Sequence, residues 1–156
     1  MLSKHQLYGI LITVQIYTVM TTQISTKLDI YINYRGDCEK AFQFYKEHLG
    51  GEIRLMLPHQ QPPPGFPKEW ESPILHAIVE IGGTSVRGAD IPGAEPMRSA
   101  YLTLNFSTAE KAEEIYQLLS SEGDVFMKME KTTFANRFAM LRDKFGTSWM
   151  ILHQIH

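Results

Sequence analysis

Glu39-Lys40-Ala41 followed by Tyr45 recurs as Glu110-Lys111-Ala112 followed by Tyr116, 71 residues further along the chain. A second motif, Gly83-Thr84-Ser85, recurs as Gly146-Thr147-Ser148. In both copies the first motif falls in a predicted helix and the second opens a predicted strand. A repeat long enough to hold a helix and several strands indicates a duplicated supersecondary module.

The first copy has the pattern β-α-β-β-β. Asp37 is placed to cap a helix whose apolar stripe runs to Leu49, and Gly50-Gly51 is expected to end that helix. In the third strand, Leu75, Ala77, Val79 and Ile81 are expected to face the helix. The predicted strands are 28–34, 52–57, 74–81 and 84–89, and a loop over 58–73 holds six of the eight prolines.

The second copy repeats the pattern. Ser107-x-x-Glu110 reads as a capping box, and Gly123 is expected to close the helix. Its predicted strands are 100–106, 124–129, 137–142 and 148–153. The sequence therefore predicts an α+β fold in which 27–156 form one domain, made of a first module over 27–92 and a second over 97–156.

Composition narrows the class of protein. The formal net charge is -2, so no basic surplus points to nucleic acid as a partner. Cys38 is the single cysteine and cannot form an internal disulfide, which favours a reducing, cytoplasmic location. Cys38 also lies on the apolar stripe of its helix, where a buried, inert thiol is expected.

Residues 1–26 form an N-terminal extension with three interpretations. Met20 could be the true start, which would make residues 1–19 dispensable. Alternatively, Ile10, Ile12, Val14 and Ile16 alternate with Leu11, Thr13, Gln15 and Tyr17, a period of two that suits an extra edge strand or an oligomer contact. The third is a secretion signal, but no small-x-small cleavage site follows. The apolar stretch Leu7 to Met20 is too short to span a bilayer, so no membrane partner is expected.

Several strings make the chain resemble the vicinal oxygen chelate superfamily, which includes glyoxalase I, bleomycin-resistance proteins and extradiol dioxygenases, and within it the PhnB-like branch. They are Tyr34 to Tyr45 with Leu49-Gly50, His76-Ala77 before Gly82-Gly83, Asp90, and Arg137 to Ile151. One departure is Ala135-Asn136, where members of the branch usually carry an aromatic residue and a glycine. The resemblance implies that the two modules form a curved, barrel-like mixed sheet, with helices on the outer face and a ligand cavity on the concave face.

Metal-dependent members of this superfamily place one ligand on the first and last strand of each module. The matching positions here are Ile30 (or Asp29 or Tyr31 if the alignment slips by one), Arg87, Tyr101 and Met150. A guanidinium repels a cation, and the other side chains are poor ligands for hard divalent ions. The sequence therefore predicts no metal and no cofactor.

The predicted site is a cavity lined by polar and aromatic groups. Alternation turns Tyr31, Asn33 and Thr103 away from the core, while Arg87 and His76 suit an anionic or carbonyl-bearing small molecule. An alternative is that Arg87 pairs with Glu80 or Asp90 and serves only the hairpin. The full set of expected ligand-binding residues is Arg87, Tyr101, His76, Tyr31, Asn33, Thr103, Met150 and Trp70, the last as a candidate lid in the proline-rich loop.

Three function classes follow. The first is a metal-free protein that binds a small molecule, and the second is a metal-independent enzyme using His76 and Arg87. The third is a metal enzyme of glyoxalase or dioxygenase type. No P-loop, dinucleotide-binding glycine motif or nucleophile elbow is present, and no nucleophile-base pair is visible, which favours the first class. Relatives implied by the resemblance are commonly homodimers, so a homodimer is expected.

Overall fold

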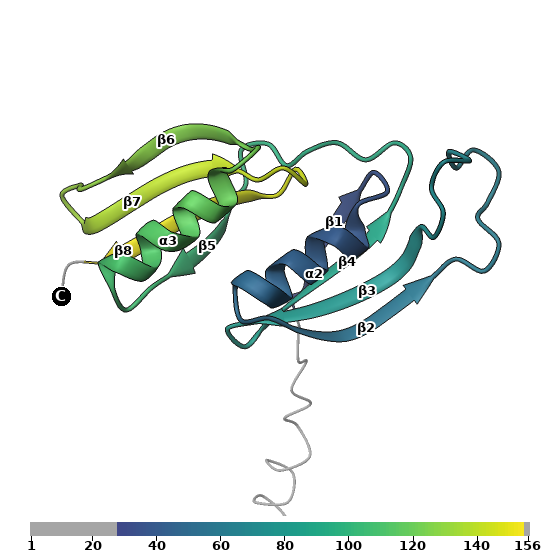
Figure 1. Cartoon of the computed structure of the whole chain (residues 1–156), viewed down its shortest axis with the longest axis horizontal. Coiled ribbons are helices and arrows are strands. Elements are labelled where there is room, and N and C mark those ends of the chain that lie inside the picture. The colour runs from purple at the N-terminus through teal and green to yellow at the C-terminus, as the bar shows by residue number, and fades with distance from the viewer. Residues whose placement is uncertain (1–27, 155–156) are drawn as a thin grey trace, which may run out of the picture.

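The computed structural model describes residues 28–154, in two consecutive β-α-β-β-β modules that lie side by side (Figure 1). Module 1 contains β1 (Ile30–Tyr34), α2 (Cys38–His48), β2 (Glu52–Pro58), β3 (Ile74–Ile81) and β4 (Thr84–Asp90). Module 2 contains β5 (Leu102–Asn105), α3 (Ala109–Ser120), β6 (Asp124–Glu130), β7 (Ala135–Arg142) and β8 (Ser148–Gln154). The predicted fold and its duplication are confirmed.

Each module folds its strands into a mixed four-stranded sheet. The strand orders are β1-β4-β3-β2 and β5-β8-β7-β6, with β1–β4 and β5–β8 parallel and the other pairs antiparallel. One helix lies across one face of each sheet, and we call the opposite face the open face (Figure 1). Within residues 28–154 the two sheets do not join into a closed barrel, although the sequence led us to expect one barrel-like sheet.

Both helix starts differ in detail from the prediction. Asp37 occupies the N-cap position of α2, but its side chain accepts no capping hydrogen bond. Asp90, at the end of β4, instead accepts from the backbone amides of Gly36 (2.8 Å), Cys38 (3.0 Å) and Ile74 (2.7 Å). A carboxylate distant in sequence therefore satisfies amides at the helix start, a contact that local capping rules cannot reveal.

In module 2 the capping residue is Thr108 rather than Ser107. The Thr108 side chain accepts from the amide of Lys111 at 3.2 Å, so the predicted capping box does not form. The helix ends at Ser120, and the left-handed backbone after it belongs to Glu122 (φ 61°), not to Gly123. In module 1 the predicted end is confirmed, because α2 stops at His48 and Gly50 has φ 66°.

A bulge changes which side chains of β3 face the core. Ala77 and Val79 are buried as predicted, but Leu75 is 47% exposed and Ile74 is buried in its place. The register shifts here, because Leu57 pairs with His76 while Pro58 pairs with Ile74. One extra residue in β3 reverses the alternation on that side of it, so the prediction for Leu75 is wrong.

A buried polar network joins the modules. The Tyr45 hydroxyl of α2 donates to Oδ2 of Asp143 at 2.7 Å, and the indole Nε1 of Trp149 donates to the same oxygen at 2.8 Å. The hydroxyl of Thr147 lies 2.9 Å from that of Tyr45 and 3.2 Å from that of Tyr34. Since Tyr34 and Tyr45 belong to module 1 and the rest to the β7–β8 turn and β8, this network fixes how the modules pack.

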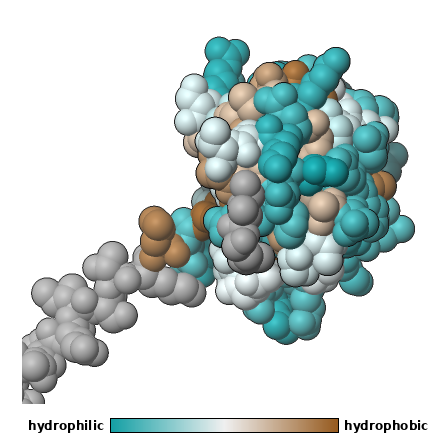
Figure 2. Space-filling model, turned by 90° about the vertical axis from the view of Figure 1, so that its left-hand side faces the viewer, coloured by the Kyte–Doolittle hydropathy of each residue, from teal (hydrophilic) through white to brown (hydrophobic). Residues whose placement is uncertain are grey.

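One end of the described part has a predominantly polar surface (Figure 2). Seen from the end of the molecule that lies at the left in Figure 1, hydrophilic residues dominate and apolar residues are scattered (Figure 2). Among residues 28–154, no helix is long and apolar enough to cross a membrane. Cys38 is fully buried, as predicted.

Candidate functional site

The open face of module 1 brings three of the predicted residues together. Tyr31 on β1 pairs in register with Arg87 on β4, and His76 comes from β3. The Tyr31 hydroxyl lies 3.0 Å from Nδ1 of His76, and the two rings are stacked with centroids 5.6 Å apart. Parallel pairing of β1 with β4 places these side chains on one face although they are far apart in sequence.

The partner of Arg87 differs from both alternatives considered from the sequence. Its Nη2 lies 3.1 Å from Oδ2 of Asp29, and about a third of each side chain is exposed (31% and 28%). Glu80 instead pairs with Nε of Arg54 at 3.3 Å, and Asp90 binds backbone amides on the helix side. The sequence did not identify this ion pair, because β1 and β4 meet only in the folded sheet.

Arg87 carries an unsatisfied donor. Its Nε is buried and has no hydrogen-bond partner within the described part of the chain. Buried polar atoms in proteins nearly always have a partner, so this atom marks a place where an acceptor is missing. A guanidinium held at one end by Asp29, with an unsatisfied donor, suits recognition of an oxygen anion.

The Tyr31 phenol is the second polar group of this face. Desolvation, followed by the charge of Cys38, raises the pKa of Tyr31 above its ordinary value of 10.0, and this outweighs the lowering effect of Arg87. The phenol therefore keeps its proton at neutral pH and can donate to Nδ1 of His76 when that nitrogen carries no proton. Asn33 lies two residues further along β1 on the same face and is exposed.

The open face of module 2 holds Tyr101, Thr103 and Met150. Thr103 and Met150 are register partners across β5 and β8, and Met150 packs against the small buried cluster of Ala135, Phe138 and Leu152. That cluster makes the floor of this face apolar. Met150 is therefore a packing residue that closes the floor beside Thr103.

Module 2 also contains two residues that sequence reasoning missed, Phe126 and Arg142. The Tyr101 ring lies edge-on to Phe126 with centroids 6.4 Å apart, and the Arg142 guanidinium lies 5.6 Å from the centroid of Phe126. Tyr101 precedes β5 and Phe126 is on β6, at opposite edges of the sheet. Only strong curvature of the sheet brings these rings together, and no local sequence signal reports it.

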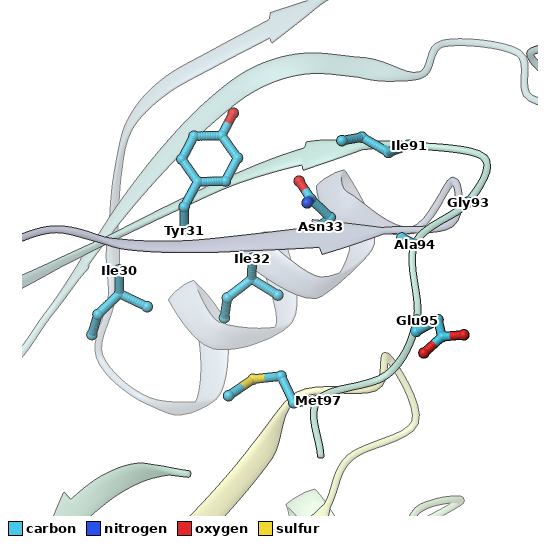
Figure 3. A pocket seen from close by; sticks show the side chains of 9 residues that line it. All are labelled: Ile30, Tyr31, Ile32, Asn33, Ile91, Gly93, Ala94, Glu95 and Met97. Carbon is cyan, nitrogen blue, oxygen red and sulfur yellow. The ribbon is translucent and has the colours of Figure 1, made fainter. Parts of the chain in front are cut away.

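The predicted residues line separate hollows. Tyr31 and Asn33 border a groove of about 440 Å³ between β1 and the 91–97 segment (Figure 3). Tyr101 and Thr103 border a second hollow of about 250 Å³ at the junction of the modules, with Val86 and Trp149.

Trp70 lies in a third place, apart from Tyr31, His76 and Arg87. Its indole packs on Gly36, where an added Cβ would come within 2.7 Å of the ring, and it meets Phe66 edge-on at 5.8 Å. It lines a polar hollow of about 430 Å³ at the start of α2. The proline-rich loop thus packs against the turn after β1, and Trp70 does not join the residues of the open face.

Comparison with known proteins identifies the superfamily to which this fold belongs. The model of the Glyoxalase/Bleomycin resistance protein/Dioxygenase superfamily matches residues 27–151. The chain is a member of this superfamily. It is 26% identical to Protein YjdN of Escherichia coli over 136 residues, 80% of this chain and 92% of the relative.

Two solved structures have a similar fold. Protein PA1353 of Pseudomonas aeruginosa is 31% identical, with a TM-score of 0.72, over 83% of this chain and 98% of that one. A Bacillus cereus PhnB protein, described as a putative 3-demethylubiquinone-9 3-methyltransferase, is 22% identical, with a TM-score of 0.71. The match covers 82% of this chain and 99% of that one. The superfamily expected from the sequence is confirmed, and the likeness to the PhnB protein is a likeness of fold.

The residues present do not fit the divalent metal carried by metal-dependent members of the superfamily. Among residues 28–154, no three His, Cys, Asp or Glu side chains gather where they could hold an ion. The positions matched to metal ligands hold Ile30 (or Asp29 or Tyr31 if the alignment slips by one), Arg87, Tyr101 and Met150. This set offers no imidazole, and its one carboxylate, Asp29, forms an ion pair with Arg87.

Proposed function

We propose that this superfamily member binds a small anionic or carbonyl-bearing molecule on the open face of module 1, without a divalent metal. The observation that carries the proposal is the buried, unpaired Nε of Arg87 beside Asp29. Leaving such a donor without an acceptor costs about 1–3 kcal/mol, and a bound oxygen anion that reached the guanidinium would recover part of this.

The neighbouring groups supply a second, uncharged contact. The Tyr31 hydroxyl and the His76 ring are hydrogen-bonded at 3.0 Å and lie on the same face as Arg87. A carbonyl or hydroxyl group of the ligand could replace or share this hydrogen bond while its anionic group contacts Arg87. Two contacts of different chemistry would orient the ligand on the sheet.

A metal-independent enzyme is the second candidate. The Tyr31–His76 hydrogen bond favours it, because a histidine oriented by a phenol can transfer a proton to or from a bound carbonyl compound. Chemical change of a bound ligand, lost in His76→Ala while binding remains, would select this candidate over simple binding.

The experiment is a thermal-shift screen of the purified protein with small carboxylates, quinones and glycopeptide-type drugs, followed by calorimetric titration of each hit. Arg87→Ala should lower affinity for an anionic hit roughly tenfold to a hundredfold, since a charge-assisted hydrogen bond contributes about 1.5–3 kcal/mol. Arg87→Lys should recover only part, because lysine lacks the planar fork.

Arg54→Ala provides a matched control. Arg54 also pairs with acidic side chains, Glu52 and Glu80, but is about half exposed on β2. Its loss should leave affinity unchanged. A protein with Arg87→Ala that is less stable but binds the hit as tightly as wild type would remove Arg87 from the site.

The metal-free part of the proposal has its own measurement. Elemental analysis of purified protein should find no stoichiometric zinc, nickel, manganese or iron. About one such ion per chain, lost in His76→Ala, would overturn it and favour a metal enzyme.

We further propose that the protein works as a two-fold homodimer. Several apolar side chains on the outer strands are exposed, among them Leu57 (46%) on β2 and Phe126 (50%) on β6. A second copy covering such residues would remove apolar area from water and enclose the open faces.

A further inference from the structure

One edge of the module 1 sheet lacks a strand partner in the described part of the chain. β1 is the end strand of its sheet and pairs only with β4. The amide of Ile91, just after β4, donates to the carbonyl of Tyr34 at 2.8 Å, so the backbone groups of Tyr34 point toward β4. Backbone groups alternate along a strand, so those of Ile32 also point toward β4, whereas those of Tyr31 and Asn33 point outward.

These outward groups open into the 440 Å³ groove between β1 and the 91–97 segment (Figure 3). On one side of the β1 ribbon, Ile30 and Ile32 extend toward Met97, and on the other side Tyr31 and Asn33 project. A strand added in this groove would therefore meet aliphatic side chains on its helix-side face and polar side chains on its open face. Free backbone groups with distinct side-chain surroundings on either side are what an added strand needs.

We propose that residues 10–17 of this chain occupy the groove as an extra strand on the outer edge of β1. These residues lie outside the described part of the structure, so the proposal rests on their sequence and on the groove. Ile10, Ile12, Val14 and Ile16 match the aliphatic side, and Leu11, Thr13, Gln15 and Tyr17 match the side of Tyr31 and Asn33. Cross-strand pairs of like polarity stabilise such an arrangement.

The connection is long enough for an antiparallel return. Residues 18–29 link the segment to the start of β1, and twelve residues can span about 40 Å. β1 has five residues and is roughly 17 Å long. The described structure begins at Leu28, two residues before Ile30, which lines the groove, so a segment tethered there has a high effective concentration.

Amide hydrogen exchange of the full chain, resolved by NMR, tests the proposal. The amides of Tyr31 and Asn33 should exchange slowly, and the amide of Ile32, bonded to β4, is the internal reference. Ile12→Lys with Val14→Lys places charges on the aliphatic side and should speed exchange at Tyr31 and Asn33 by at least about tenfold, with Ile32 unchanged. Thr13→Lys with Gln15→Lys adds the same charges on the open side, where lysine is tolerated on edge strands, and should change exchange little.

Three results would overturn the proposal. The first is fast exchange of Tyr31 and Asn33 in the full chain, which would mean an open edge. The second is slow exchange that persists after Ile12→Lys with Val14→Lys and after deletion of residues 1–19. The third is protection that disappears on dilution, which would assign the edge to a second copy.

Discussion

Replacing Asp143 with alanine should destabilise the protein more than any exposed acidic substitution, because this carboxylate joins the two modules. It is 4% exposed and accepts four hydrogen bonds. Two come from side chains, Tyr45 at 2.7 Å and Trp149 at 2.8 Å. The other two come from the backbone amides of Phe145 at 2.9 Å and Thr147 at 3.0 Å.

The size of the effect follows from which donors lose their acceptor in Asp143→Ala. Nε1 of Trp149 and the amide of Thr147 are buried and would be left unpaired, at about 1–3 kcal/mol each. The Tyr45 hydroxyl keeps the Thr147 hydroxyl at 2.9 Å. Removing the carboxylate also removes its own desolvation cost, so we expect a net loss of about 2–4 kcal/mol and a melting temperature roughly 5–15 °C lower.

Urea denaturation at pH 7 measures the loss. Asp124→Ala is the control, since that carboxylate is 61% exposed and pairs with Arg142, and its removal should cost less than about 1 kcal/mol. A double-mutant cycle with Tyr45→Phe should give a coupling energy of about 1–2 kcal/mol across the modules. Equal losses for Asp143→Ala and Asp124→Ala, or additive effects in the cycle, would refute the reasoning.

The buried carboxyl of Asp143 should also make the stability of the folded protein depend on pH. Burial raises the pKa of Asp143 above its ordinary value of 3.8 and outweighs the hydrogen bonds, which lower it. The Asp143 carboxyl therefore binds its proton more tightly in the folded protein than in the unfolded chain. The stability that this proton contributes is lost as pH rises from about 3.8 through the folded pKa. The free energy of unfolding of wild type minus that of Asp143→Asn should therefore fall as pH rises over that window. A rise in this difference would contradict the assignment.

Three further predictions concern packing and assembly. Burial, followed by the charge of Asp90, raises the pKa of the Cys38 thiol, so a thiol reagent at neutral pH should label it only after unfolding; rapid labelling of the folded protein would contradict this. Gly88→Ala should lower the free energy of unfolding by about 1–3 kcal/mol, because a Cβ there would lie 2.8 Å from the Phe42 ring. Gly93→Ala is the control and should be neutral, because a Cβ at Gly93 meets nothing within 4 Å. Equal melting temperatures for the two variants would show that α2 can shift. Light scattering should give about twice the chain mass of 17.9 kDa at micromolar concentration, and a value near 18 kDa would exclude the dimer.

Local patterns in the sequence were enough to predict the order of elements. Alternation of polar and apolar residues located every strand to within a few residues, and the repeated helix motif identified the duplication. The same alternation placed Tyr31 and Thr103 on the open faces and Ala77 and Val79 in the core. These outcomes depend only on the period of each segment, which the chain carries wherever the segment packs.

Contacts between segments were decided only by the tertiary structure. The partner of Arg87 is Asp29 because β1 pairs in parallel with β4, and Asp90 binds the amides at the start of α2 because β4 ends beside them. A single bulge in β3 buries Ile74 and exposes Leu75. Curvature of the second sheet brings the Tyr101 ring into contact with Phe126. Register, bulges and curvature arise from how whole strands pack, so no residue's local pattern contains them.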